Sequence, residues 1–100
     1  MTLRRIIVAD VPDQRLALRT DGGRITLRLR LNPSIDRWAF DLSRDDEEVL
    51  FGRRIVTGVD LLAAFGLGVG SLFAHEATPE DVPSRDGLVS GRVRLMHYQP

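Results

Sequence analysis

Residues 24–32, RITLRLRLN, alternate apolar and polar side chains from end to end, and this alternation limits the fold more than any other feature of the chain. A helix cannot keep every second side chain on one face, whereas a β-strand does so by its geometry. We therefore predict a strand with one buried face and one exposed face. The buried face consists of Ile25, Leu27, Leu29 and Leu31.

Two neighbouring stretches repeat this pattern and are connected to it by turn sequences. Residues 14–20, QRLALRT, are separated from the first stretch by DGG, a strong hairpin signal because glycine accepts positive φ. Residues 37–43, RWAFDLS, follow an Asn-Pro-Ser turn and alternate again. Their inward face consists of Trp38, Phe40 and Leu42. The three stretches predict an antiparallel meander.

Further strands are predicted along the chain, at a spacing of about 8–12 residues with turn sequences between them. They cover residues 3–9, 49–52, 53–58, 69–76 and 88–98. Such a series is typical of an all-β, mainly antiparallel fold, either a small barrel or a sandwich of about six to eight short strands. No linker or composition shift divides it, so residues 1–100 are predicted to form a single domain, with ATPEDVPSRDG at 77–87 as an exposed polar loop.

One segment departs from the strand pattern and predicts a short helix near residues 58–65. Its first residues have the spacing of a capping box, in which a threonine hydroxyl and an acidic side chain each satisfy a free amide of the first turn. The structural motif consists of Thr57, Gly58, Asp60, Leu61 and Leu62. Because two helical turns are marginal in isolation, we expect the apolar side to be buried over an open end of the sheet.

Composition excludes several classes of protein. The chain has 14 positive and 14 negative residues, every positive one is arginine, and there is no cysteine. A balanced charge disfavours a general nucleic-acid binder, and without cysteine there can be no disulfide and no cysteine-ligated zinc. No apolar run approaches the roughly 20 residues of a membrane helix, and the apolar patch at the N-terminus is short for a signal peptide. We expect a soluble protein made in a cytoplasm.

Three segments contain residue types that are found in catalytic or ligand-binding sites, and none has the sequence context that such a site requires. GLGVG at 66–70 follows a predicted helix and precedes a strand, the reverse of a phosphate-binding loop. The acidic run at 45–48 lacks the ligand spacing of a calcium loop and reads as a solvated hairpin tip. His75 with Glu76 or Asp81 is the remaining acid–base or metal-binding set, and it lacks the arrangement of a helical zinc site. We expect no catalytic residues, no metal site and no cofactor.

Arginine side chains gather on the polar face of the predicted sheet. They are Arg15, Arg19, Arg28, Arg30 and Arg37. Aromatic residues that could stack on nucleic-acid bases project from the opposite, apolar face. Because the arginine fork pairs bidentately with carboxylates, the polar face is predicted to meet either water or an acidic surface of another subunit. The predicted interface residues are Arg28, Arg30 and Trp38.

Three stretches together resemble the small baseplate plug proteins of contractile-tailed phages. They are VPDQRLALRTDGGRITLRLRLN, WAFDLS and RRIVTGVDLL. The shared features are a Pro-x-Gln entry to the second strand (Pro12 to Gln14), a strand ending in Leu-Asn, the Trp38 to Asp41 strand, and Val-Thr-Gly-x-Asp-Leu-Leu at 56–62, which is the most specific. The similarity covers about residues 6–72. A hairpin that carries Asp-Gly in the family has Asp45-Asp46 here.

The resemblance implies a non-enzymatic structural protein at the centre of a tail baseplate. It would plug or adapt the end of the tail tube, contact hub, spike and tube proteins, and be oligomeric in the assembled particle. The location would be the virion, or a prophage or tail-like particle, after synthesis in the host bacterial cytoplasm. Two alternatives remain open: a small nucleic-acid-binding barrel of the OB type, and a small enzyme that uses His75.

Overall fold

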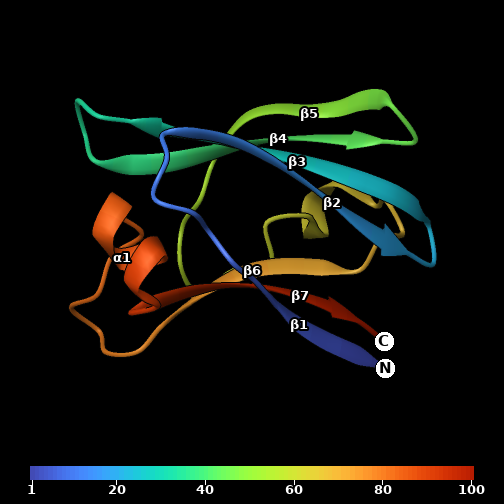
Figure 1. The fold of residues 1–100 in the computed structure, drawn as a ribbon. Coiled ribbons are helices and arrows are strands. Elements are labelled where there is room, and N and C mark those ends of the chain that lie inside the picture. Colours follow the sequence, from blue (N-terminus) through green and yellow to red (C-terminus); the bar gives the residue numbers. More distant parts are fainter.

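The computed structural model describes residues 1–100 and contains seven strands in two sheets, with one short α-helix and one 3₁₀ turn (Figure 1). The elements are β1 (Thr2–Ile6), β2 (Asp13–Thr20), β3 (Gly23–Asn32), β4 (Arg37–Arg44), β5 (Glu47–Arg54), η1 (Ala63–Phe65), β6 (Ser71–Glu76), α1 (Arg85–Ser90) and β7 (Val93–Gln99). The four-stranded sheet has the order β2-β3-β4-β5, and the three-stranded sheet has the order β1-β7-β6. All strand pairs are antiparallel.

The four-stranded sheet is the predicted meander. Each strand pairs with its sequence neighbour, and in the register Leu27 of β3 lies opposite Leu16 on one side and Leu42 on the other. The apolar residues of β3 and β4 that alternation placed inward are fully buried, except for Leu31, which is partly buried against the core. The fully buried ones are Ile25, Leu27, Leu29, Trp38, Phe40 and Leu42. The predicted strand pattern is therefore confirmed for this half of the molecule.

The three-stranded sheet packs its inner face against the meander and brings the two ends of the chain together. β1 pairs with β7 from Thr2 opposite Gln99 to Ile6 opposite Leu95, so the termini lie side by side (Figure 1). One cluster of 17 buried hydrophobic residues fills the space between the sheets. The sheets do not close into a barrel, so of the two predicted all-β architectures the open sandwich is the one observed.

The strand β5 contains the strand predicted at 49–52 and the first two residues of the strand predicted at 53–58, with a β-bulge between them, whereas residues 55–58 lie outside it. The register shifts between Phe40 and Leu42 of β4, and Gly52 adopts a φ of 65° at the irregularity. A bulge inserts an unpaired residue and bends the strand, and glycine takes the left-handed conformation without a steric cost. The alternation is broken at this point, and for that reason the sequence reads as two strands.

The helical segments differ from the prediction. Within residues 58–65 only Ala63–Phe65 is helical, as a 3₁₀ turn whose N-cap residue, Leu62, forms no side-chain capping bond. The α-helix lies instead at Arg85–Ser90, in the region predicted as the end of the polar loop and the start of the last strand. The last strand accordingly begins at Val93 and not at residue 88, and the first strand ends at Ile6 and not at residue 9.

The position of α1 follows from two local signals. The Ser84 hydroxyl accepts a hydrogen bond from the Gly87 amide at 3.0 Å, and Gly91 ends the helix with a φ of 88°. Serine at the N-cap and a left-handed glycine after the last turn are the preferred helix boundaries. Leu88 is buried against the core, which supplies the tertiary support that a helix of this length needs. No helix in the structure has both the length and the apolar character needed to cross a bilayer.

Candidate interaction surfaces

The outer face of the four-stranded sheet carries the predicted arginines, and the structure shows that Arg28 is already paired. Its Nε and one terminal nitrogen donate to the two carboxylate oxygens of Asp13 at 3.0 Å and 2.7 Å. The hydrogen bonds from this guanidinium lower the pKa of the Asp13 carboxyl below its ordinary value of 3.8 and raise the pKa of Arg28. Both side chains remain partly exposed to solvent.

Arg30 is paired in a different way, next to the bulge. It donates to the Asp41 carboxylate at 2.8 Å, and the same oxygen accepts the Gly52 amide at 2.7 Å. Asp41 is only 7% exposed, whereas the guanidinium of Arg30 lies 4.8 Å from the centre of the Phe51 ring. Asp41 therefore satisfies both the unpaired amide of the bulge and the cation beside it. The charges of Arg28 and Arg30 are therefore neutralised within the chain, whereas Arg15, Arg19 and Arg37 on the same face form no ion pair.

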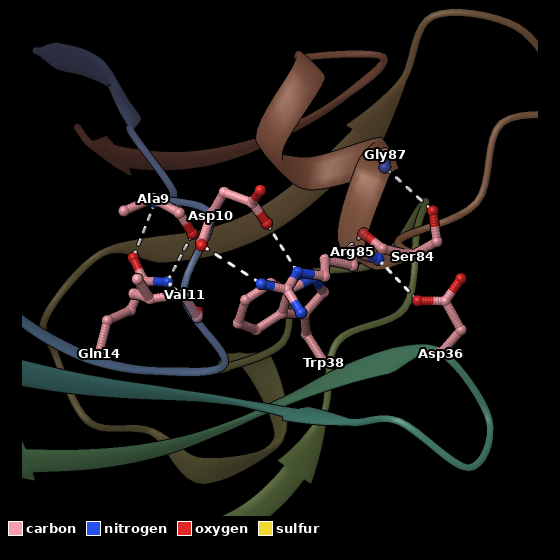
Figure 2. Close-up of polar contacts among 9 residues, drawn as sticks. All are labelled: Ala9, Asp10, Val11, Gln14, Asp36, Trp38, Ser84, Arg85 and Gly87. Carbon is pink, nitrogen blue, oxygen red and sulfur yellow. Dashed lines mark hydrogen bonds and ion pairs between the residues drawn. The ribbon is translucent and has the colours of Figure 1, made fainter.

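Trp38, the third predicted interface residue, lies in the core and not on a surface. It is fully buried, and its indole N–H donates to the Ser84 carbonyl at 3.0 Å (Figure 2). A buried tryptophan needs a partner for this N–H, and the N-cap residue of α1 supplies it. The prediction that Trp38 takes part in an exposed interface is therefore wrong for the folded chain. Alternation placed the ring inward correctly, and the large side chain then acts as an anchor for α1.

Arg85 completes this anchor at the end of the sandwich where three connecting segments meet (Figure 2). Its guanidinium donates to the Asp10 carboxylate at 2.6 Å, in the loop between β1 and β2. Its backbone amide donates to the Asp36 carboxylate at 3.0 Å, in the turn between β3 and β4. The predicted polar loop is thus tied to two other loops by one residue.

Gln14 has a structural role that explains the Pro-x-Gln feature of the sequence. Its amide oxygen accepts the Ala9 amide at 2.9 Å, and its amide nitrogen donates to the carbonyls of Ala9 and Val11 at 2.9 Å and 3.0 Å (Figure 2). A single side chain therefore satisfies three backbone groups of the loop that crosses between the sheets. This fixes the path by which β1 leaves one sheet and β2 enters the other.

The predicted capping motif at 57–62 forms an edge cover for the three-stranded sheet. Thr57 makes a parallel bridge with Ala74, and the Leu61 amide donates to the Leu72 carbonyl at 2.7 Å. The Asp60 carboxylate accepts the amides of Leu62 at 3.0 Å and Leu72 at 3.2 Å and does not reach back to Thr57. The capping-box interpretation is therefore wrong in its bonding, because a strand edge competes for the same carboxylate.

Burial of the motif follows the prediction in part. Leu62 is buried in the core, and Leu61 and Phe65 are partly buried against it. The segment protects the outer edge of β6, which would otherwise present unpaired backbone groups to other chains. The role of the motif is therefore to close one sheet edge.

Sequence analysis missed the outer face of the three-stranded sheet. Its outward residues are Leu3 and Arg5 of β1, Arg94, Met96 and Tyr98 of β7, and Ser71, Phe73 and His75 of β6. Consecutive rows of the register bring Leu3 opposite Tyr98 and Phe73 opposite Met96. The sequence does contain a signal, because these strands have apolar residues on both faces, which is typical of a strand covered on both sides.

The candidate acid–base residues do not converge. His75 and Glu76 are consecutive in β6 and so project to opposite faces of the sheet, while Asp81 bonds to Thr78 within its own loop. A shallow groove is lined by Asp60, Ser71 and His75 among others, but no hydrogen bond joins these three side chains. No group of three or more histidine, aspartate or glutamate side chains is placed to hold a metal ion.

The glycines at 66–70 connect η1 to β6, and Gly70 is the closely packed one, whereas Gly66 and Gly68 are exposed. Gly70 has a φ of 89°, and a Cβ atom there would lie 2.4 Å from the Tyr98 carbonyl oxygen. His97, fully buried beside it, has its Nε2 atom 2.7 Å from the Val69 carbonyl oxygen. The glycine-rich stretch is therefore a connector that is tightly packed at its Gly70 end.

Comparison with known proteins agrees with the resemblance that the sequence motifs indicated. A family described as cyanophage baseplate Pam3 plug gp18 matches residues 3–100, which is nearly the whole chain. No curated protein matches the chain. The match extends beyond residues 6–72, where the motif resemblance was found, to α1 and β7. The chain belongs to this family of phage baseplate plug proteins.

Proposed function

We propose that this protein is a non-enzymatic component of a tail baseplate that plugs or adapts the central end of the tail tube. The observation that carries the proposal is the family match over residues 3–100. A baseplate plug has a structural role in the virion tail and associates with other baseplate proteins. The finer assignment, to contacts with hub, spike and tube proteins as an oligomer, is our inference. We also infer that the protein is synthesised in the bacterial host and that residues 1–100 fold as a single domain.

The arrangement of the side chains supports a role in contacts and not in a reaction. One oxygen of the Asp60 carboxylate accepts the amides of Leu62 and Leu72, and no hydrogen bond joins Asp60 to His75 or Ser71, as a nucleophile and its base would require. Several charged side chains are instead paired across strands or between loops, as in Arg28 with Asp13 and Arg85 with Asp10. Such pairs stiffen a small sandwich and leave its surfaces to make contacts.

The predicted contact through Arg28 and Arg30 remains a prediction. Each guanidinium has a carboxylate partner within the chain, so an acidic subunit would have to displace Asp13 or Asp41 or share their arginines. The same pairing weakens the nucleic-acid alternative, because phosphate binding depends on unpaired cationic side chains. These neutralise the phosphates and so release the counterions of the nucleic acid. Salt-dependent retention of the purified protein on single-stranded DNA would support that alternative.

The proposed function is tested by isolating tail particles produced from the genome that encodes the chain. We expect mass spectrometry to detect the chain in washed particles, and imaging of the baseplate to locate it on the central axis next to the tube. We expect a deletion to give particles with an altered or missing central baseplate density. Absence of the chain from intact particles would contradict the proposal, and so would a location away from the baseplate.

A further inference from the structure

The outer face of the three-stranded sheet has the composition of a protein-binding surface. Leu3 on the edge strand β1 is 58% exposed, and the partly exposed side chains of Tyr98 and Met96 on β7 and Phe73 on β6 continue the apolar surface across the sheet. Val59, 49% exposed, extends the apolar surface over the covering segment as one wall of a shallow groove. Contiguous apolar surface on a small protein marks an interaction site, and phenylalanine, methionine, tyrosine and arginine are the residues that interfaces favour.

The outward strand positions of this face carry charges of one sign, and these charges form no ion pair within the chain. Arg5 lies opposite Met96, and Arg94 lies opposite His75, so two arginines flank the apolar centre. Neither forms an ion pair within the chain. No aspartate or glutamate occupies an outward position on β1, β6 or β7. Asp60, at the margin of the groove, is already bonded to two amides.

We propose that this face docks onto another protein, through an apolar patch on the partner and carboxylates placed opposite Arg5 and Arg94. Apolar burial would supply most of the affinity, and bidentate arginine–carboxylate pairs would set the orientation. The proposal rests on the proposed function, because it names the surface by which a baseplate plug binds a neighbouring protein.

A second copy of this chain is a poor occupant of the same surface. In a two-fold dimer each face meets its own copy, so the unpaired arginines of both faces would be brought together with no aspartate or glutamate at the outward strand positions to pair with them. Like charges brought together in this way oppose association. The complementary surface therefore belongs to a different protein.

Photo-crosslinking in assembled particles tests the occupant of the face directly. A benzoylphenylalanine is introduced at Phe73, and the matched control carries it at Ala17, on the outer face of β2 in the other sheet. We expect the probe at Phe73 to join the chain to a different baseplate protein, at a site that contains aspartate or glutamate. A crosslink to a second copy of this chain, or no crosslink at Phe73 in particles that contain the chain, would overturn the proposal.

Paired substitutions measure the two kinds of contact separately. Phe73→Ala and Arg94→Glu are each expected to lower the number of copies per particle at least threefold, and the double variant at least tenfold, as for central interface residues. The controls on the opposite face, Phe51→Ala and Arg19→Glu, are expected to assemble at the wild-type level. Thermal melts of all variants show whether each one is folded before it is scored.

The outcomes separate this proposal from the proposed function. If the wild-type chain is absent from particles, the proposed function fails. If the wild-type chain is present and folded variants at Phe73 and Arg94 assemble as well as the controls, only the docking face is wrong. Loss of assembly confined to Phe51→Ala and Arg19→Glu would also overturn the proposal and would move the interface to the four-stranded sheet.

Discussion

The two sheets share one core but present outer faces of opposite character. On the four-stranded sheet, Arg28 and Arg30 are neutralised by Asp13 and Asp41. On the three-stranded sheet, Arg5 and Arg94 flank an apolar patch and have no carboxylate partner. Arg15, Arg19 and Arg37 on the four-stranded sheet also form no ion pair, so the two faces differ mainly in the apolar patch that lies beside the unpaired arginines of the three-stranded sheet. The count of arginines on a face therefore does not show how many remain for another protein, because some of them are paired within the chain.

The largest expected effect tests whether the inner faces of the two sheets contribute equally to stability, although their outer faces differ. Leu27→Ala in the four-stranded sheet and Leu72→Ala in the three-stranded sheet should each lower the free energy of unfolding by about 2–5 kcal/mol, because both side chains are fully buried. Urea denaturation measures both. Phe73→Ala, which removes an outward side chain from the strand that contains Leu72, is the control and should cost less than about 1 kcal/mol. A negligible loss of stability for Leu72→Ala would show that the inner face of the three-stranded sheet contributes less to the fold than that of the four-stranded sheet.

The next effect concerns the ion pair between Arg30 and Asp41 on the four-stranded sheet. Asp41→Ala should lower the free energy of unfolding by about 1–3 kcal/mol, because it leaves the Gly52 amide and the Arg30 guanidinium without their acceptor. Ser43→Ala, at the next outward position of β4, should stay within about 0.5 kcal/mol of the wild type. If Asp41→Ala matched this control, the pairing on this face would be incidental.

The covered edge of the three-stranded sheet gives a third test. Asp60→Ala should lower the free energy of unfolding by about 1–3 kcal/mol, because the amides of Leu62 and Leu72 lose their acceptor. Thr57→Ala should have a much smaller effect, since its hydroxyl caps no helix. Thermal melts distinguish the two variants. A large loss at Thr57 with little change at Asp60 would restore the capping-box interpretation.

A substitution in the β4–β5 turn should stabilise the four-stranded sheet. Asp45 and Asp46 both adopt positive φ, at 50° and 67°, which glycine tolerates better than aspartate. Asp46→Gly should raise the free energy of unfolding by about 0.5–1 kcal/mol. The 3.5 Å contact between Asp46 and Arg24 would be lost in this variant, and its contribution reduces the gain. Asp45→Gly is the contrasting variant, because its carboxylate accepts the Arg24 amide and this bond would be lost. Equal gains from both would contradict this explanation.

The smallest effect depends on pH and concerns Asp13. Its pKa in the folded chain lies below the ordinary value of 3.8, so the pair with Arg28 stabilises the fold fully above pH 3.8 and is lost as the pH falls through the lowered pKa. The difference in stability between wild type and Asp13→Asn should therefore shrink as the pH falls below about 4. Denaturation at a series of pH values measures it. A difference independent of pH would contradict the assigned pKa shift.

Much of the four-stranded sheet could be predicted because its signals are local. In β3 the alternation alone identifies the buried face, and the DGG turn sets the pairing with β2. The Val-Thr-Gly-x-Asp-Leu-Leu stretch indicated the family without indicating what its residues bond to. The capping-box interpretation failed because Asp60 has a long-range competitor, the Leu72 amide of β6, which the spacing of Thr57 and Asp60 does not include.

By itself, the sequence determined the meander of β2, β3 and β4, most inward side chains of β3 and β4, and the family to which the chain belongs. Only the tertiary structure decided that Trp38 anchors α1, that Arg28 and Arg30 are paired, and that the apolar residues of β1, β6 and β7 meet on one outer face. The physical reason is that alternation is a property of neighbouring residues, whereas pairing and exposure depend on which distant strands lie side by side. β1 and β7, from opposite ends of the chain, form one surface that neither strand specifies alone.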